Sequence, residues 1–172
     1  MLGTPCCGRR TLVQPESVRD DGHEQRRSVS DIEIARPPEA VFPYVTDPSR
    51  LAEWQESVVS ARVEGNGVPA VGSKAITTRR IGRAKRTMTM ELTEIDAPRS
   101  WAVRGIDGPV RGIVKGTIEP LGDGARSRVT IELDFEGHGL GKLLVPLVVR
   151  RQAQREMPRN LRNLKERLES GA

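Results

Sequence analysis

The stretch EGHGLGKLLVPLVVRRQAQREMPRNLRNLKERLE, residues 136–169, decides the fold because it predicts one long C-terminal helix over residues 137–169. Apolar side chains recur along it at steps of three and four, which places them on one side of an α-helix. The opposite side is strongly basic. The apolar series is Val145, Val149, Ala153, Met157, Leu161, Leu164 and Leu168, and the basic series is Lys142, Arg150, Arg151, Arg155, Arg159, Arg162, Lys165 and Arg167.

The first half of this helix is apolar on more than one side, so we expect it to be buried more completely around its circumference than the second half. Pro146 fits a first turn, where its missing N–H costs nothing, or it marks a kink. Pro158 lies deep in the pattern and predicts a bend near residues 154–157. Such a helix needs a broad apolar surface to pack on. The additional apolar residues are Leu140, Leu143, Leu144, Leu147 and Val148.

The chain before the helix predicts a sheet that can supply this surface. Seven segments alternate apolar and polar residues with the period of two that is typical of half-buried strands. Turn sequences separate most of them, and Asp107-Gly108 is a strong hairpin signal. Hairpins make the sheet antiparallel, and one apolar face per strand means that the sheet covers something on one side only. The predicted strands are residues 29–35, 58–64, 74–80, 87–95, 100–106, 111–119 and 126–135.

Two short helices are predicted between the first and the second strand. Pro38 and Glu39 are typical of a first helical turn. Asp47-Pro48-Ser49 ends that helix and begins the next one, at residues 49–54. We therefore expect an α+β fold, in which a curved antiparallel sheet of about seven strands wraps around the long C-terminal helix.

This order of elements, together with four segments of sequence, resembles the SRPBCC (START, helix-grip) superfamily and, within it, the bacterial polyketide cyclase/dehydrase-like subgroup. The resemblance implies one helix-grip domain at residues 28–170. It is specific for the fold and weak for function, because such folds host many ligands and chemistries. The segments are IEIARPPEAVFPYVTDPSRLAEW at 32–54, IDAPRSWAVRG at 95–105, IEPLGDGARSRVTIELDF at 118–135, and residues 139–169 with both prolines.

The resemblance implies a cavity for a hydrophobic small molecule, a lipid or a polyketide-like compound, between the sheet and the first half of the long helix. The several apolar sides of that half are what a cavity wall needs. The alternative is that the same residues fill a solid core. Trp54 is expected beside the entrance. The expected ligand-binding residues are Trp54, Met88, Met90, Trp101, Val103, Val114, Ile118, Leu133, Phe135, Leu140, Leu144, Leu147 and Val148.

The alternative function is an enzyme of the cyclase or dehydrase type that acts on a lipophilic substrate, but the sequence shows no catalytic constellation. Catalysis needs convergent titratable groups, and the chain has two histidines, His23 and His138. The glycine-rich run at residues 137–141 lacks the Lys-Ser/Thr of a phosphate-binding loop. No catalytic residue, cofactor or metal is expected. The cations that alternate with the apolar strand residues, and are therefore expected to face solvent, are Arg104, Arg111 and Lys115.

Residues 1–27 are polar, charged and aperiodic, so we expect a disordered or loosely ordered tail before the single domain. Cys6 and Cys7 are neighbours without an accompanying His or Cys cluster, which argues against a disulfide between them and against a metal site. No apolar run has the length of a membrane span, and residues 1–10 lack the apolar core of a signal peptide. The expectation is a cytoplasmic protein, monomeric or weakly dimeric.

The 172-residue chain carries a net charge of +5, and the basic excess lies in the long helix and at residues 79–86. This surface is either a solvated face or a docking face for weak contact with an anionic membrane. The first alternative is supported because helix-end cations complement the helix dipole. A nucleic-acid partner is not expected. The cations of the predicted hairpin are Arg79, Arg80, Arg83, Lys85 and Arg86.

Overall fold

The computed structural model describes residues 27–65, 69–107, 110–137 and 144–171, and in the last helix it describes side chains from Val149 onward. The predicted order of strands and helices is confirmed. The elements are β1 (Ser28–Ile34), α1 (Pro38–Thr46), the 3-10 helix η2 (Pro48–Arg50), α2 (Leu51–Trp54), β2 (Val58–Val63), β3 (Lys74–Ile81), β4 (Ala84–Asp96), β5 (Ser100–Gly105), β6 (Val110–Leu121), β7 (Arg126–Gly137) and α3 (Leu144–Ser170).

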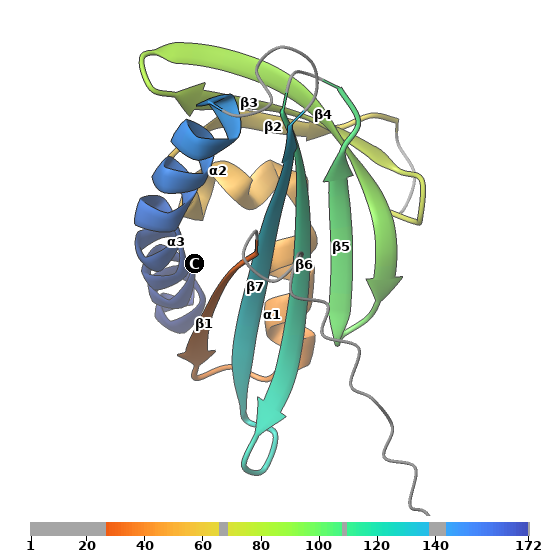
Figure 1. Ribbon diagram of the computed structural model, residues 1–172. Coiled ribbons are helices and arrows are strands. Elements are labelled where there is room, and N and C mark those ends of the chain that lie inside the picture. The colour runs from red at the N-terminus through yellow and green to blue at the C-terminus, as the bar shows by residue number, and fades with distance from the viewer. Residues whose placement is uncertain (1–26, 66–68, 108–109, 138–143, 172) are drawn as a thin grey trace, which may run out of the picture.

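The strands form one seven-stranded sheet in the order β1-β7-β6-β5-β4-β3-β2, and every neighbouring pair is antiparallel. Consecutive strands from β2 to β7 pair with each other, as hairpin connections require. The sheet curls, and α3 runs along its open side while α1 and α2 lie inside the curl (Figure 1). The expected α+β helix-grip fold is therefore confirmed.

One end of the concave face of the sheet is tightly packed. Opposed residues of an antiparallel ladder point to the same face, and the register places Ile118 opposite Val129 and Ile131 opposite Gly116. Trp101, opposite Gly116 on the other side, contacts Phe42 of α1 edge to face, with ring centroids 6.1 Å apart. We call this region, formed by Ile118, Val129, Ile131 and Trp101, the packed end. All four of these side chains are buried in the hydrophobic core.

Gly116 makes room for the largest side chain of the packed end. A Cβ atom on Gly116 would lie within the contact distance of the Trp101 ring. The indole therefore lies directly over the glycine backbone, and any larger residue at this position would displace the ring.

α3 begins at Leu144, whereas the sequence placed the start of the helix at Gly137. Gly137 is the last residue of β7, because the ladder between β6 and β7 continues to the pair Val110–Gly137. Pro146 consequently lies in the first turn, where a missing N–H costs no hydrogen bond. The helix continues through Pro158 to Ser170. His138, Leu140 and Leu143 lie outside the described residues.

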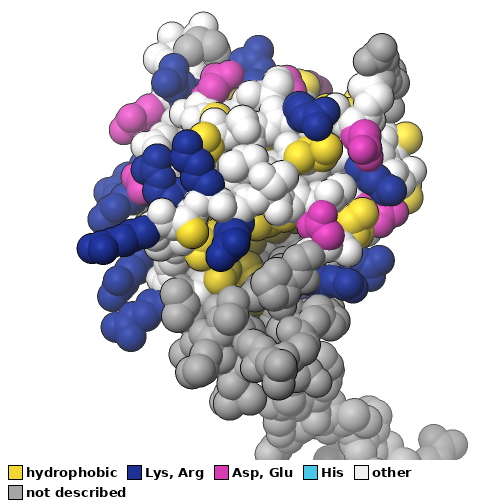
Figure 2. All heavy atoms as spheres, turned by 90° about the horizontal axis from the view of Figure 1, so that it is seen from above, with side chains coloured by type: hydrophobic (Ala, Val, Ile, Leu, Met, Phe, Trp, Pro, Cys, Tyr) yellow, Lys and Arg dark blue, Asp and Glu magenta, His cyan; other side chains and the backbone are white. Residues whose placement is uncertain are grey.

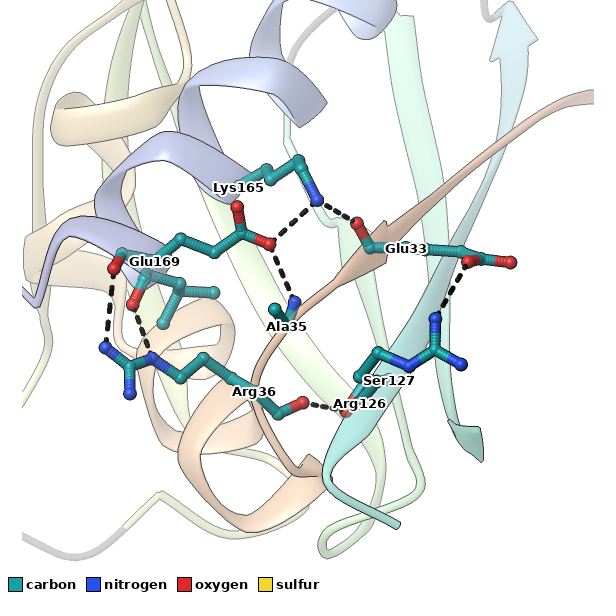
Figure 3. Close-up of polar contacts among 8 residues, drawn as sticks. Glu33, Ala35, Arg36, Arg126, Ser127, Lys165 and Glu169 are labelled. Carbon is teal, nitrogen blue, oxygen red and sulfur yellow. Dashed lines mark hydrogen bonds and ion pairs between the residues drawn. The ribbon is translucent and has the colours of Figure 1, made fainter. Parts of the chain in front are cut away.

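A group of hydrogen bonds, which we call the polar latch, fixes the C-terminal end of α3 to the end of β1 (Figure 3). The carboxylate of Glu169 accepts hydrogen bonds from the Ala35 backbone N–H and from Lys165 Nζ, both at 2.7 Å. These bonds hold the pKa of Glu169 below its ordinary value. Arg36 Nε donates to the carbonyl of Leu168 at 2.8 Å, which satisfies one of the carbonyls that a helix end leaves without an internal partner.

Candidate functional site

Exposure rises along the concave face from the packed end toward the β3–β4 hairpin. Ile118 is 2% exposed and Leu133 is 7% exposed. Phe135, Met90 and Met88, which follow toward the hairpin, point to the same face but keep part of their surface accessible. We call the region around these three side chains the hairpin end. These three side chains are therefore less completely covered than those of the packed end.

Small residues form the middle of the hairpin end. The register places Gly112 opposite Phe135, and it places Met90 between Gly105 and Ala75 on its two neighbouring strands. A Cβ atom built on Gly112 would meet the Phe135 ring at 3.5 Å, an ordinary contact distance. The Phe135 ring therefore lies over Gly112, and positions on three strands here carry no side chain beyond a Cβ atom.

The structure places the expected ligand-binding residues in two groups. Trp54, Trp101, Ile118 and Leu133 are buried in the core, and Trp54 is only 3% exposed. The second group is partly exposed on the concave face. It consists of Met88, Met90, Val103, Val114 and Phe135. Leu140 and the side chains of Leu144, Leu147 and Val148 lie outside the described part of the chain.

Arg79 lies on the concave face, whereas the sequence assigned it to the exposed cations of the hairpin; that assignment is wrong. It donates hydrogen bonds to Gln55 Oε1 at 2.6 Å and to Ser57 Oγ at 3.4 Å. Burial lowers the pKa of its guanidinium group to about 10, so it remains charged at neutral pH. The cause is the period of two along β3, which points Arg79 to the same side as the buried Thr77.

Two polar atoms in the described interior lack a hydrogen-bond partner. Thr77 Oγ1 and Trp54 Nε1 are buried, and neither has a hydrogen-bond partner in the described structure. Thr77 is 1% exposed and lies opposite Met88 in the ladder, which places its side chain at the hairpin end. Such groups are uncommon, since leaving a buried hydrogen-bonding group unsatisfied costs about 1–3 kcal/mol. No sequence pattern pointed to Thr77, because threonine is an ordinary strand residue, whereas Trp54 was expected as a ligand-binding residue for its ring.

The other cations of the hairpin form one surface with those of α3. Gln152 on α3 accepts from the Gly82 backbone N–H at 3.2 Å and donates to the Arg80 carbonyl at 3.0 Å, so the hairpin turn is fixed beside the helix. Figure 2 shows Lys and Arg side chains gathered on the side of the molecule where α3 lies. We call these residues the basic surface; its exposed members are Arg80, Arg83, Lys85, Arg86, Arg151, Arg155, Arg159, Arg162 and Arg167.

The carboxyl groups and the phenol group whose pKa values are shifted lie away from the hairpin end. Burial, followed by a hydrogen bond to Glu53, raises the pKa of Tyr44 on α1. Arginine partners lower the pKa of Glu33 and of Asp96 at the surface. Among the described residues, no three His, Cys, Asp or Glu side chains are grouped as metal ligands would be.

The cations expected to face solvent do so only in part. Arg104 and Lys115 are exposed. Arg111 is partly buried, and its Nε atom has no hydrogen-bond partner in the described structure.

No helix in the described ranges is long and apolar enough to cross a membrane.

The described residues line two shallow hollows, and both are away from the hairpin end. Both lie beside the C-terminal half of α3 and open widely to solvent, so they do not enclose a small molecule. Glu53, Asn163, Glu166, Arg167 and Ser170 line one of them, and Ser30, Asp31, Ile32, Pro158, Leu161 and Arg162 line the other.

Solved structures with the same fold include proteins of several kinds. The Zhui aromatase/cyclase from Streptomyces sp. R1128 superposes with a TM-score of 0.71 at 16% identity, over 84% of this chain and 93% of that one. A START superfamily protein from Mycobacterium smegmatis gives 0.70 at 15% identity, over 85% and 99%. TTHA0849 from Thermus thermophilus gives 0.70 at 19% identity, over 85% and 99%. At these identities the likeness concerns the fold alone.

The sequence itself matches one family over nearly its whole length. No curated protein matches the chain. The profile of the family described as polyketide cyclase/dehydrase and lipid transport matches residues 25–169, which includes every described strand and helix from β1 almost to the end of α3. The seven-stranded sheet and the C-terminal helix give the chain a helix-grip fold, and this match shows that it belongs to the polyketide cyclase/dehydrase and lipid transport family.

Proposed function

We propose that the protein binds a hydrophobic small molecule, a lipid or a polyketide-like compound, between the hairpin end of the sheet and the first half of α3. The observation that carries this proposal is the contrast along one face. The large apolar side chains that point inward are buried at the packed end, whereas Met88, Met90 and Phe135 keep accessible surface at the hairpin end, next to the small residues Gly112, Gly105 and Ala75.

The chemistry of the described lining fits an apolar ligand. Met88 and Met90 are flexible and polarizable, so they adapt to ligands of different shape. Phe135 adds a broad apolar ring. Pockets for small molecules are lined mainly by such residues together with a few polar groups. The residues expected from the sequence remain part of this proposal, with Trp101, Ile118 and Leu133 as the floor of the cavity and Leu140, Leu144, Leu147 and Val148 as its helical wall.

The test is a panel of fatty acids, their esters and aromatic polyketide-like compounds, measured by native mass spectrometry and by tryptophan fluorescence. The variant Gly112→Leu should abolish binding, because its side chain would occupy the proposed ligand position at the hairpin end. Lys115→Leu adds the same side chain to an exposed position of the same strand and should leave binding unchanged. Failure of every apolar compound to bind, or equal binding by Gly112→Leu and the wild type, would contradict the proposal.

The second candidate is an enzyme of the cyclase or dehydrase type with a lipophilic substrate. It is supported by the polar groups at the hairpin end, where Arg79 could stabilise an oxyanion and Thr77 could hydrogen-bond a substrate oxygen. Glu156 on α3, which acts electrostatically on Arg79, is the described carboxylate near them, and it is the candidate for proton transfer. Incubation with a poly-β-ketone analogue tests this candidate, and a product whose formation is lost in Arg79→Gln would favour catalysis over binding alone.

A carrier of lipophilic cargo needs a place to exchange it, and the basic surface lies beside the hairpin end. We therefore include weak, salt-dependent contact with anionic membranes in the proposal, since each Lys or Arg near such a surface contributes about 1 kcal/mol. A cytoplasmic location and a monomeric or weakly dimeric state are likewise part of it. Size-exclusion chromatography with light scattering tests the oligomeric state.

A further inference from the structure

Arg79 is the charged group of the described hairpin end whose position is fixed most firmly. The hydrogen bonds to Gln55 and Ser57 hold its guanidinium group toward the segment that joins α2 to β2. The backbone N–H of the next residue, Arg80, donates to the Ser57 carbonyl at 2.7 Å. Both side-chain and backbone hydrogen bonds therefore connect β3 to this segment. The guanidinium group is therefore held in one place before any ligand arrives.

The charge of Arg79 is not neutralised by an ion pair with any described carboxylate. Its two hydrogen-bond acceptors are neutral. Glu156 on α3 acts on it electrostatically and raises its pKa, against the larger effect of burial. The carboxylate of Glu156, however, accepts a hydrogen bond from Gln152 Nε2 at 2.7 Å. A guanidinium group has five N–H donors, so Arg79 retains donors for a further acceptor.

Thr77 supplies a second, independent observation on the same face. It precedes Arg79 by two residues in β3, so both side chains point to the same side of the sheet. Its hydroxyl group is buried and has no partner among the described residues. A buried hydroxyl and a desolvated cation, side by side and both incompletely satisfied, are what a ligand oxygen with negative charge requires.

We propose that the ligand is an amphipathic carboxylic acid, with its carboxylate bound by Arg79 and Thr77 and its apolar body lying over Met88, Met90 and Phe135. The inference rests on the proposed binding function and adds the class of ligand to it. A carboxylate matches the planar guanidinium donors. A dianionic phosphate would bring a second negative charge close to Glu156, which favours the singly charged group.

Calorimetric titration with dodecanoate and with methyl dodecanoate tests this assignment, because the two probes share one alkyl chain and the ester replaces the carboxylate by a neutral methyl ester. Wild-type protein should bind the acid roughly ten- to a hundredfold more tightly than the ester, as expected for hydrogen bonds to charged groups. Arg79→Gln should reduce affinity for the acid to that for the ester and leave the ester unchanged. Arg104→Gln is the matched control, since Arg104 is exposed on β5 and lies outside the basic surface.

Thr77→Val keeps the shape of the side chain and removes its hydroxyl group, so it should weaken binding of the acid by a few-fold and leave the ester unchanged. The preference of the wild type for the acid needs no variant, and it decides the question even if Arg79→Gln does not fold. Equal affinity of the wild type for acid and ester would overturn the assignment and leave the proposed function standing. Binding of neither probe, nor of any other apolar compound, would remove both.

Discussion

The two ends of the concave face differ in how the same kind of strand residue is used. At the packed end, α1 and the C-terminal half of α3 cover the sheet, and Leu164 is 0% exposed. At the hairpin end, Met88 and Met90 are only partly buried, and the sheet carries Gly112, Gly105 and Ala75 in its middle. The packed end provides stability, and the hairpin end provides room.

The polar groups are divided in the same way. The polar latch at the C-terminal end of α3 satisfies the side chains of Glu169 and Arg36 with short hydrogen bonds (Figure 3). At the hairpin end, Thr77 Oγ1 has no described partner and Arg79 has no described counter-ion. The latch residues are therefore satisfied by one another, whereas Thr77 and Arg79 have polar capacity left for a ligand.

The largest expected effect is on stability at the packed end. Leu164→Ala should lower the free energy of unfolding by about 2–5 kcal/mol, because it leaves a cavity beneath α3. Met157→Ala, on the same helix but nearer the hairpin end, should cost less than about 2 kcal/mol. Urea unfolding of both variants checks this difference. Equal costs would mean that the two halves of α3 are packed alike.

A pair of glycine substitutions on β6 sharpens the comparison. Gly116→Ala should lower the free energy of unfolding by about 1–3 kcal/mol, since its methyl group would collide with the Trp101 ring. Gly112→Ala, two strand repeats away toward the hairpin end, should change it by less than about 1 kcal/mol, because its methyl group would have ordinary contacts. Thermal and urea unfolding measure both. A large cost for Gly112→Ala would show that the floor of the hairpin end is already filled.

The polar latch should make stability depend on pH. The pKa of Glu169 is held low by Lys165 and the Ala35 N–H, so its contribution is present at neutral pH and is lost as the pH falls below the ordinary value of about 4.5. Glu169→Gln should cost about 1 kcal/mol at pH 7 and flatten this acid dependence. Glu166→Gln, on the exposed side of the same helix, is the control. A wild-type acid profile in Glu169→Gln would contradict the role of the latch.

The smallest expected effect concerns the basic surface at the hairpin end. Arg83→Gln should weaken binding to anionic vesicles by up to about fivefold at low salt, because one such charge contributes about 1 kcal/mol. Arg104→Gln removes an exposed charge from β5, away from the hairpin, and should have no effect. Co-sedimentation with liposomes measures both. Equal binding of the wild type to neutral and anionic vesicles, or binding to neither, would show that this surface is only solvated.

Local sequence patterns were enough to predict the elements and their order. The period of two in β4, β5, β6 and β7 identified the concave face correctly, because side-chain alternation is a property of each strand by itself. The three- and four-residue spacing of Leu161, Leu164 and Leu168 likewise predicted the buried side of α3. Asp47 was predicted to begin the second short helix, and its side chain accepts from the Ser49 backbone N–H at 2.9 Å.

The sequence alone could not predict the polar part of the candidate site. In β3, Ala75, Thr77 and Arg79 alternate with Ile76 and Thr78, so both faces carry a similar mixture and neither is marked as the inner one. The run of cations after Thr78 is typical of a solvated turn. Only the pairing of β3 with β2 and β4, and the hydrogen bonds of Arg79 to the segment after α2, turn that side chain inward.

Long-range contacts set the remaining features. The latch joins Arg36 to Leu168 across 132 residues, a distance at which no sequence spacing carries information. The start of α3 depends on how far β7 pairs with β6, so periodicity alone extended the helix too early. By itself, the sequence determined which residues share a face, because the geometry of strands and helices is local. The tertiary structure decided which faces are covered, and how completely, because burial depends on segments that are distant in the chain.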